Sequence, residues 1–325
     1  DVYKRQGRKA CLHVNHAGGA ANPKVIGRAP LSASAFTCPR TGATADALTV
    51  SEIEEIVRAF GEATRKAVKA GFDAVELQAG HGYLVDQFLN PAVNQRADDY
   101  GVDRFMFARS VIQALVEAGP GLALIIRISG EGMAPGTSTP PEDIDRVVNI
   151  ARGAGFSAVH VGMGSTCFSP AWYFHHMSLP EAPQERALAR VKANSGMPLI
   201  AAGRMGSLER VQRILKEGLA DMIALGRPLI ADPDLIQKWA GSNPTAVQPC
   251  GYCLQGCLVH VADGTGIGCN FNPEVGRHEP GRSDNPLSVL VAGGGPAGLS
   301  VARYLAERDH RVTLAEKSEI LGGKA

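Results

Sequence analysis

Short apolar runs alternate with longer amphipathic stretches along most of the chain. Six runs are predicted to be buried strands: Leu12–His16, Ala74–Leu77, Leu122–Ile128, Ala158–Val161, Leu199–Ala202 and Met222–Leu225. Apolar residues recur at helical spacing in the intervening stretches 51–68, 105–116, 144–152, 187–193 and 208–217. This alternation is typical of β-α units on a parallel sheet, and eight such units close a TIM barrel. The pattern therefore predicts an α/β fold with an incomplete (β/α)8 TIM barrel.

The first long helix has clear end signals. Ser51 followed by Glu54 predicts a capping box at its start, and Gly71 marks its end.

The passage before this helix, Ala17–Ala47, is rich in Gly, Pro and Ser, and we expect an elaborated loop there. Asp1–Gln6 matches nothing that follows, and we expect the opening strands of the barrel and the natural N-terminus to be missing.

The strand and helix pattern changes after Pro233. We expect a barrel over residues 7–240, a cysteine-rich segment over 241–276, a polar linker over 277–286 and a second domain from 287 to 325. In that second domain, Leu287–Val291 and Val312–Ala315 are predicted strands on either side of a helix over Pro296–Arg308. A strand, a helix and a strand in this order predict the start of a Rossmann-like domain.

Composition narrows the class of partner. The 325 residues include 45% hydrophobic residues and carry a formal net charge of +1 without a block of lysine or arginine. This balance gives no electrostatic footprint for nucleic acid or an anionic membrane, and the apolar runs are too short to span a bilayer. We expect small-molecule partners and a cytoplasmic protein, and a homo-oligomer is possible.

Four of the seven cysteines lie in one window, Cys250-x2-Cys253-x3-Cys257-x11-Cys269, whereas the other three are scattered. In a large α/β protein such clustering favours a metal site over disulfides. Thiolates suit iron–sulfur clusters and zinc alike. Zinc sites usually pair one C-x2-C with a second pair, but the second half here contributes one cysteine, so the spacing favours a [4Fe–4S] cluster.

A glycine-rich turn follows the first strand of the second domain. Gly293, Gly295, Ala297 and Gly298 form a G-x-G-x-x-G-type turn that opens a helix, whose amides would face a pyrophosphate. Glu316 closes the next strand, where a carboxylate can accept from ribose hydroxyls. Together these features predict dinucleotide binding, the alternative being a simple glycine turn.

Several barrel strands end in polar residues, at the end of the barrel where such enzymes keep their sites. Gly203-Arg204 and Gly226-Arg227 follow the last two strands, and this repetition predicts phosphate binding rather than two surface arginines. Arg127 lies in an otherwise apolar strand and needs a partner, either a flavin ring or a salt bridge at the barrel mouth.

The loop after the second predicted strand contributes candidate catalytic residues. Tyr83 is a plausible proton donor, with packing as the alternative, and His81 is a candidate contact to a ring or substrate. The aromatic run Trp172–His176, after the fourth predicted strand, is either a substrate wall or a lid on the cysteine segment.

These residues make the chain resemble the Fe–S-containing branch of the old yellow enzyme family, similar to 2,4-dienoyl-CoA reductase and trimethylamine dehydrogenase. The resemblance runs from about Gly7 to the end of the chain. Besides the cysteine window, it rests on the ordered motifs Asn15–Gly18, Gly71–Leu77, His81–Leu84, Gln87–Pro91, Asn94–Arg96 and Leu225–Pro228.

The resemblance implies FMN in the barrel, a [4Fe–4S] cluster beside it, and FAD on the C-terminal domain, where NAD(P)H delivers hydride. Electrons would pass from NAD(P)H through FAD and the cluster to FMN and then to an activated alkene, with Tyr83 protonating the product. It assigns FMN contacts to Arg127, Arg204 and Arg227, and FAD contacts to the glycine turn and Glu316. His13 stands where the family usually has a flavin-contacting glutamine, and we count it among the cofactor-binding residues.

Three further departures from the family leave the substrate open. Gln78 replaces a histidine that contacts the substrate carbonyl, Gly19 replaces a common arginine, and Thr166 or Cys167 stands where a second acid is kept. Enoates, enoyl- or dienoyl-CoA esters and enones are all compatible. An amine dehydrogenase or N-demethylase of the trimethylamine dehydrogenase type, with Trp172 and Tyr173 as an aromatic bowl, is the alternative, and a non-catalytic zinc or electron-transfer module is a third.

Overall fold

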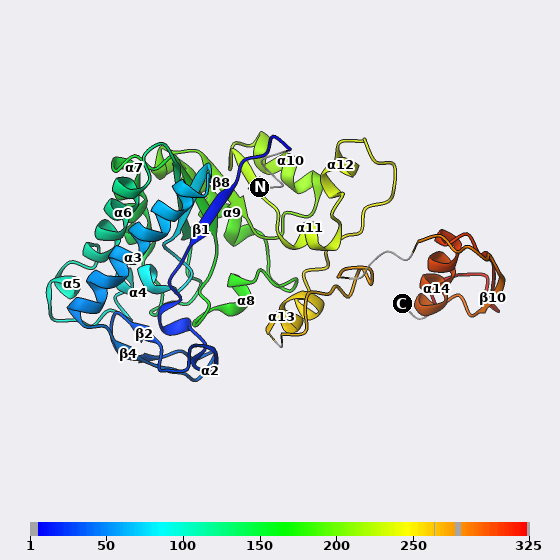
Figure 1. Cartoon of the computed structure of the whole chain (residues 1–325), viewed down its shortest axis with the longest axis horizontal. Helices are drawn as coiled ribbons and strands as arrows, with labels where there is room; N and C mark the ends of the chain where they lie inside the picture. Colours follow the sequence, from blue (N-terminus) through cyan, green and yellow to red (C-terminus); the bar gives the residue numbers. More distant parts are fainter. Residues whose placement is uncertain (1–5, 263, 277–280, 324–325) are drawn as a thin grey trace.

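A computed structural model describes residues 6–262, 264–276 and 281–323, which form three parts in chain order (Figure 1). An open barrel comes first, a cysteine-rich segment follows, and a small β-α-β unit completes the described chain. Of the predicted N-terminal stretch 1–6, only Gln6 is described. Within the predicted linker 277–286, residues 277–280 lie outside the described residues.

The barrel is one sheet of six parallel strands, joined in the order β1-β5-β6-β7-β8-β9. Their bounds are β1 Cys11–Val14, β5 Ala74–Gln78, β6 Ala123–Ser129, β7 Ala158–Gly162, β8 Leu199–Ala202 and β9 Met222–Ala224. Each strand pairs with the strand of this sheet that follows it along the chain, as successive β-α units of a TIM barrel do. The predicted fold class is therefore confirmed, with the sheet open between β1 and β9.

The strands of this sheet alternate between a helix-facing and an interior face. In β6, Leu124, Ile126 and Ile128 are buried in the hydrophobic core, whereas Ile125 and Arg127 are only partly buried. Successive side chains of a strand point to opposite faces, so Arg127 lies on the face that lines the barrel interior. This alternation directs polar strand residues away from the helices and towards the interior of the barrel.

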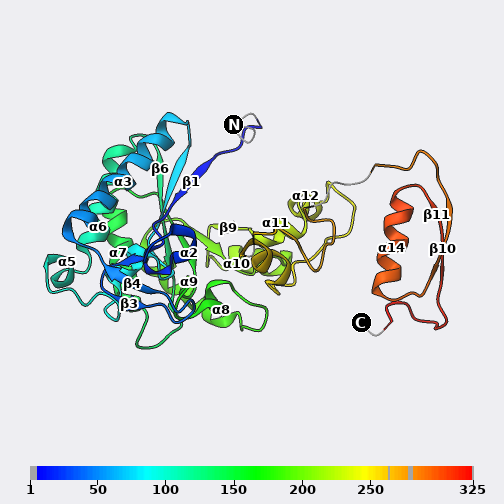
Figure 2. The same cartoon turned by 60° about the horizontal axis from the view of Figure 1, so that its bottom comes forward.

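Five longer helices accompany the sheet: α3 Val50–Lys69, α6 Met106–Ala118, α7 Pro141–Gly153, α9 Ala182–Ser195 and α10 Leu208–Lys216. Helices α3, α6 and α7 lie together along the β5–β6 side of the barrel in both views (Figures 1 and 2). The stacked rings of Phe88 and Phe107, 4.2 Å apart, anchor this side of the core. No helix of the described chain is both long enough and apolar enough to traverse a lipid bilayer.

Shorter helical turns complete the barrel and the segment that follows it. They are η1 Gly18–Ala20, α2 Pro23–Ile26, α4 Leu84–Leu89, α5 Asp99–Val102, α8 Pro170–Tyr173, α11 Arg227–Ala231, α12 Leu235–Trp239, the π-helical turn η2 Gln255–Val259 and α13 His260–Ala262. The last two belong to the cysteine-rich segment. Most of these turns follow strand ends, so they hold the loops that surround the site.

The expected loop over Ala17–Ala47 contains a small three-stranded sheet. Its strands are β2 Leu31–Ser32, β3 Phe36–Thr37 and β4 Thr44–Ala47, in the order β2-β4-β3. Two-residue strands are too short to produce a recognisable alternation of apolar and polar positions. This is why the sequence pattern did not reveal them.

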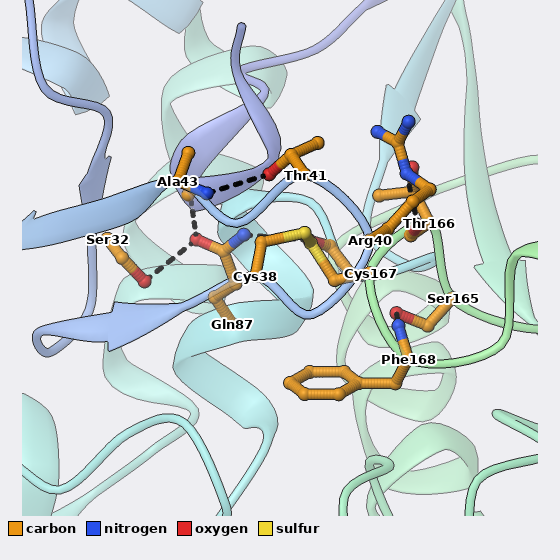
Figure 3. Close-up of a disulfide and its surroundings, with 12 residues drawn as sticks. Ser32, Cys38, Arg40, Thr41, Ala43, Gln87, Ser165, Thr166, Cys167 and Phe168 are labelled. Atoms are coloured by element: carbon orange, nitrogen blue, oxygen red, sulfur yellow. Dashed lines mark hydrogen bonds between the residues drawn. A yellow bond between two sulfur atoms is a disulfide. The ribbon is translucent and has the colours of Figure 1, made fainter. Parts of the chain in front are cut away.

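A disulfide joins Cys38 to Cys167, two of the cysteines that the sequence pattern treated as scattered (Figure 3). They are separated by 129 positions, and both are buried. The bond ties the loop between β3 and β4 to the loop after β7, and the Arg40 Nε donates to the Thr166 carbonyl at 2.7 Å beside it. The sequence pattern gave no prediction for this pair, because the two cysteines lie far apart in the chain.

The C-terminal unit consists of β10 Ser288–Ala292, α14 Pro296–Glu307 and β11 Arg311–Ala315, with the two strands parallel. These elements match the predicted strand, helix and strand closely. They lie apart from the barrel, beyond the cysteine segment (Figure 1). The start of a Rossmann-like domain predicted from the sequence is thus confirmed.

Helix α3 begins with a capping box, but one formed by Thr49 and Glu52 rather than the predicted Ser51 and Glu54. The Thr49 hydroxyl accepts from the Glu52 N–H at 3.3 Å, and the Glu52 carboxylate accepts from the Thr49 N–H at 2.8 Å. The spacing T-x-x-E and the spacing S-x-x-E overlap here, so the sequence alone allowed a start shifted by two residues.

We predict that Thr49→Ala lowers the free energy of unfolding by about 1 kcal/mol, because it leaves an amide at the helix start without its acceptor. Ser51→Ala is the matched control and should change it by less than about 0.5 kcal/mol, as expected for a surface site without such a role. Urea unfolding followed by circular dichroism measures both. A larger loss from Ser51→Ala would show that the helix starts two residues later.

Candidate active site

A cavity of about 380 Å³ opens at the carboxyl ends of β6–β9. Six of the residues predicted from the sequence line it: His81, Arg127, Gly203, Arg204, Gly226 and Arg227. Further lining residues are His160, Gly162, Tyr173, Phe174, His175, Ala202, Met205, Ala224, Leu225, Pro228 and Tyr252. The predicted residues come from four separate β-α units, so only the tertiary fold brings them together.

Several buried nitrogen atoms that belong to the lining residues have no hydrogen-bond partner among the described residues. They are Arg127 Nε, His160 Nε2, Arg204 Nε and one terminal nitrogen of Arg227. Leaving a buried polar group unpaired costs about 1–3 kcal/mol, and more when the group is charged. The cavity is therefore suited to a ligand that carries hydrogen-bond acceptors and negative charge.

Glu76 of β5 is the buried carboxylate beside this cavity. It accepts hydrogen bonds from His13 Nδ1 at 2.7 Å and His160 Nδ1 at 2.6 Å, and Arg127 lies 3.8 Å away. Burial raises the pKa of Glu76, but the bonds from both histidines and the nearby charges outweigh it and hold that pKa well below its usual range. Because a carboxylate only accepts, Nδ1 carries the proton in each ring, which leaves His160 Nε2 free for the cavity.

His13 does not itself line the cavity, although we predicted it to bind the cofactor. It lies on β1 directly opposite Glu76 in the strand register, and its side chain is 39% exposed. Its one described polar contact is the bond to Glu76. His13 is therefore linked to the cavity indirectly. It bonds to Glu76, and Glu76 also bonds to His160, which lines the cavity.

Two glycines make room for histidine rings in the cavity wall. A Cβ on Gly162 would lie 2.4 Å from His81 Nε2, and one on Gly203 would lie 2.3 Å from the ring of His175. Burial, reinforced by nearby charges, holds the pKa of His81 well below its usual range and lowers that of His175 to about 3. Both rings are thus neutral near pH 7 and serve as polar walls rather than as cations.

Tyr83 reaches the cavity through a second tyrosine. Its hydroxyl lies 2.8 Å from the hydroxyl of Tyr173, and Tyr173 lines the cavity whereas Tyr83 does not. Burial and the adjacent Tyr173 raise the pKa of Tyr83 well above its usual range. Tyr83 therefore keeps its proton at neutral pH, which is the state required of a proton donor.

The loop that carries Tyr173 is fixed at its base. The Thr166 N–H donates to the His81 carbonyl at 2.9 Å, and the disulfide joins Cys167 to Cys38 (Figure 3). Within the aromatic run, Tyr173 and Phe174 line the cavity with their rings 4.7 Å apart. Trp172 is not among the lining residues, so only part of the predicted substrate wall is formed.

A second, smaller pocket is lined by all four clustered cysteines, Cys250, Cys253, Cys257 and Cys269. No group of three or more His, Cys, Asp or Glu side chains in the described residues is arranged to hold a single metal ion. A four-iron cluster holds its thiolates farther apart than one tetrahedral ion does. Four thiolates around one pocket are a donor set that suits either a [4Fe–4S] cluster or zinc. Burial raises the pKa of Cys250, and the nearby Arg227 charge opposes this rise.

The glycine-rich turn between β10 and α14 has the compact form expected of a dinucleotide-binding turn. A Cβ on Gly298 would lie 1.9 Å from the Gly293 carbonyl oxygen, so only glycine allows this packing. Gly295 caps α14, and Ala297 lies in its first turn. Glu316 accepts from the Gly294 N–H at 2.6 Å, so its carboxylate braces the turn from the end of β11.

Three residues important to the site were missed by the sequence reasoning: Glu76, His160 and Tyr252. His160 lies in the apolar strand Ala158–Gly162, just as Arg127 lies in an apolar strand, so the argument used for Arg127 applies equally to it. Glu76 lies in an otherwise apolar run in the same way. Tyr252 carries no such signal, because it lies in the loop between two cysteines.

Comparison with known proteins gives two family matches. A model of the NADH:flavin oxidoreductase / NADH oxidase family matches residues 2–245, and one of the NAD(P)-binding Rossmann-like domain matches residues 291–325. The cysteine segment lies between the two matched regions. These matches agree with the resemblance drawn from the sequence motifs.

Individual relatives point to more than one chemistry. A metal reductase of Desulforamulus reducens is 34% identical over 100% of this chain and 49% of its own length. A cinnamate reductase of Clostridium sporogenes is 34% identical over 94% of this chain and 49% of its own length. The structure of histamine dehydrogenase from Rhizobium sp. 4-9 superposes with a TM-score of 0.83 at 27% identity, over 99% of this chain and 48% of that protein. The chain thus spans about half the length of the relatives it matches.

Glu76→Gln is predicted to remove a pH-dependent part of the stability. The pKa of Glu76 in the folded chain lies below its ordinary value of 4.5, so its charge stabilises the fold above that pH and loses its effect as the pH falls. The difference in unfolding free energy between wild type and variant should be largest near neutral pH and shrink below about pH 5. Urea unfolding across this range measures it.

Glu62→Gln is the matched control for this prediction. Glu62 is exposed on α3 and pairs with Arg65 within the same helix. Its removal should leave a small difference with little dependence on pH. If the effect of Glu76→Gln were equally constant from neutral to acid pH, the ionic role of Glu76 would be refuted.

Proposed function

Because the chain belongs to the NADH:flavin oxidoreductase / NADH oxidase family, we propose that it reduces an activated carbon–carbon double bond with electrons from NAD(P)H. The substrate class is an enoate, an enoyl- or dienoyl-CoA ester or an enone. The observation that carries the proposal is the Tyr83–Tyr173 hydroxyl pair, in which the raised pKa of Tyr83 keeps a proton beside a cavity suited to a flavin. Reduction of an alkene needs one hydride and one proton, and this pair can supply the proton.

FMN fits the larger cavity because its acceptors match the unpaired arginine N–H groups there, while a ring N–H could donate to His160 Nε2. Arg127 and His160 would face the ring system, while Arg204 and Arg227, with Gly203 and Gly226, would hold the phosphate. When bound, FMN supplies the hydride for the substrate. The Glu76 carboxylate holds the side chains of Arg127 and His160 in place, because it lies against both of them.

The other cofactors follow from the remaining two parts of the chain. Cys250, Cys253, Cys257 and Cys269 would hold a [4Fe–4S] cluster, which transfers single electrons. Gly293, Gly295, Ala297, Gly298 and Glu316 would contact FAD, the acceptor of hydride from NAD(P)H. This order of parts supports a relay from NAD(P)H through FAD and the cluster to FMN.

The proton step rests on residues of this chain. Tyr173 lines the cavity and Tyr83 lies behind it, so a proton that leaves the Tyr173 oxygen can be replaced from the Tyr83 oxygen 2.8 Å away. The neutral ring of His81 packs edge-on to Tyr173 at 5.4 Å and helps to hold it in place. Gln78 stands where the family usually has a histidine. Its Oε1 contacts His81 Nδ1 at 3.0 Å, so Gln78 helps to hold the His81 ring in place.

Oxidation of a methylated amine is the second candidate function. Tyr173 and Phe174 provide adjacent aromatic rings at the cavity wall, and such rings attract ammonium groups. The likeness to histamine dehydrogenase supports this reading. The high pKa of Tyr83 favours the reductive function, because amine oxidation calls for a proton acceptor rather than a donor.

A panel of substrates under anaerobic conditions separates the two functions. In the holoprotein reduced with NAD(P)H, we expect an enoate, an enoyl-CoA or an enone to reoxidise the flavin, as measured by its absorbance in a stopped-flow instrument. If no alkene reoxidised it and a methylated amine reduced the oxidised flavin instead, the proposal would be wrong and the amine dehydrogenase function correct.

Tyr83→Phe should slow flavin reoxidation by the alkene about 100-fold, because the proton supply to Tyr173 is lost. Flavin reduction by NAD(P)H should be unchanged, since it needs no proton from this pair. Tyr100→Phe is the matched control, because Tyr100 packs against Phe88 outside the cavity and should leave both rates unchanged. Equal slowing of both half-reactions by Tyr83→Phe would refute its role as a proton donor.

The metal assignment has a separate prediction. Anaerobically purified protein should contain iron and acid-labile sulfide, and Cys257→Ser should lose most of both. Cys11→Ser is the control, because Cys11 is an exposed free cysteine on β1 outside the window. One equivalent of zinc without iron would instead support the non-catalytic metal module.

A further inference from the structure

Tyr252 lies between two ligand cysteines and yet also lines the larger cavity. It occupies the loop between Cys250 and Cys253, and it borders both the cysteine pocket and the cavity at the ends of the barrel strands. Among the described residues, Arg227 is the one other that borders both. The two pockets are thus separated by a wall that consists of these two side chains.

The ring of Tyr252 lies close to both of the arginines that we assign to phosphate binding. The guanidinium carbon of Arg204 is 5.7 Å from the ring centroid, and that of Arg227 is 5.3 Å from it. Both distances are within the range of cation–π attraction. A single aromatic ring therefore positions both cations, although Arg204 and Arg227 follow different strands.

The hydroxyl of Tyr252 contacts the same region of the barrel. It accepts a hydrogen bond from the Gly206 N–H at 2.6 Å, and a Cβ on Gly206 would lie 2.4 Å from the hydroxyl oxygen. The loop after β8, which contains Gly203 and Arg204, is thereby tied to the cysteine loop.

The backbone of the cysteine loop is also held in place by the barrel. Tyr252 has a φ of 52° and Leu254 a φ of 66°, in the left-handed region that side-chain-bearing residues seldom adopt. Such conformations persist where surrounding contacts enforce them. The Met177 N–H also donates to the Tyr252 carbonyl, at 3.2 Å, so both the side chain and the backbone of Tyr252 are held by the barrel.

We propose that Tyr252 is a positioning residue that couples the two cofactor sites, so that cluster assembly on the cysteines and binding of the FMN phosphate strengthen each other. This proposal rests on the cofactors proposed above. A cluster that fixes Cys250 and Cys253 would fix Tyr252 between them, and Tyr252 would in turn hold Arg204 and Arg227 ready for the phosphate. Such coupling is reciprocal: each cofactor raises the affinity for the other by the same factor.

The affinity for FMN, measured with and without the cluster, tests the coupling. The holoprotein is stripped of FMN, half of it is then freed of iron by oxidation and chelation, and FMN is titrated into both forms by fluorescence quenching. We expect the wild type to bind FMN about ten-fold more tightly when the cluster is present. Riboflavin, which lacks the phosphate, should bind equally well to both forms.

Two variants separate the ring from the hydroxyl. Tyr252→Ala should bind FMN about ten-fold more weakly than wild type and with the same affinity in both forms, because neither arginine is positioned. Tyr252→Phe keeps the ring and loses the bond from Gly206, so we expect it to retain part of the dependence on the cluster. It also keeps the test valid if the alanine variant fails to fold.

Tyr304→Ala is the matched control. Tyr304 lies on α14 with Arg308 at 5.7 Å from its ring, so it repeats the arginine–tyrosine contact outside both pockets, and FMN binding should not change. Equal FMN affinity in the two forms of wild type would overturn the coupling while leaving the cofactor assignment intact. A protein that binds no FMN, or binds zinc in place of iron, would overturn both.

Discussion

Buried positive charge is the constraint on which the site depends. Arg127, Arg204 and Arg227 reach one cavity from three different strand ends, and each is at least partly withdrawn from water. A buried cation needs either a counter-charge or a ligand with acceptors. Glu76 meets this need beside Arg127 and Glu181 beside Arg204, whereas one terminal nitrogen of Arg227 has no hydrogen-bond partner among the described residues. The carboxyl ends of parallel strands converge at this cavity, so the fold itself creates the demand for an anionic ligand.

The walls of the cavity are built by contacts that leave little freedom. Gly162 and Gly203 are small enough for the rings of His81 and His175 to lie against the backbone. The loop that carries Tyr173 is anchored by the Thr166 backbone and by the disulfide at Cys167. Since catalytic geometry tolerates little misplacement, side chains held in this way are better suited to chemistry than freely rotating ones.

The two cofactor regions are adjacent parts of one structure. Arg227 begins α11 immediately after β9, and the cysteine segment returns to the same side of the barrel through Tyr252. A module that merely bound a metal would have no need of such contacts with the proposed phosphate-binding end of the barrel. The shared wall of Arg227 and Tyr252 therefore agrees with a path for electrons between a cluster and a flavin better than with an independent metal site.

Local patterns were enough to predict the strands of the barrel and of the C-terminal unit, the longer helices, the cysteine window and the glycine-rich turn, because the residues that define each of them are neighbours in the sequence. Where two local signals overlapped, as at Thr49 and Ser51, the sequence could not choose between them, and the packing of α3 did. Only the tertiary structure could join Cys38 to Cys167, Tyr83 to Tyr173, or Glu76 to both His13 and His160. These partners lie 63 to 129 positions apart, and a contact over such distances leaves no periodic trace in the chain. The sequence by itself determined the local elements and motifs, and the folding of parallel strands into an open barrel decided which of their residues meet, including Glu76 and His160, which no local pattern had singled out.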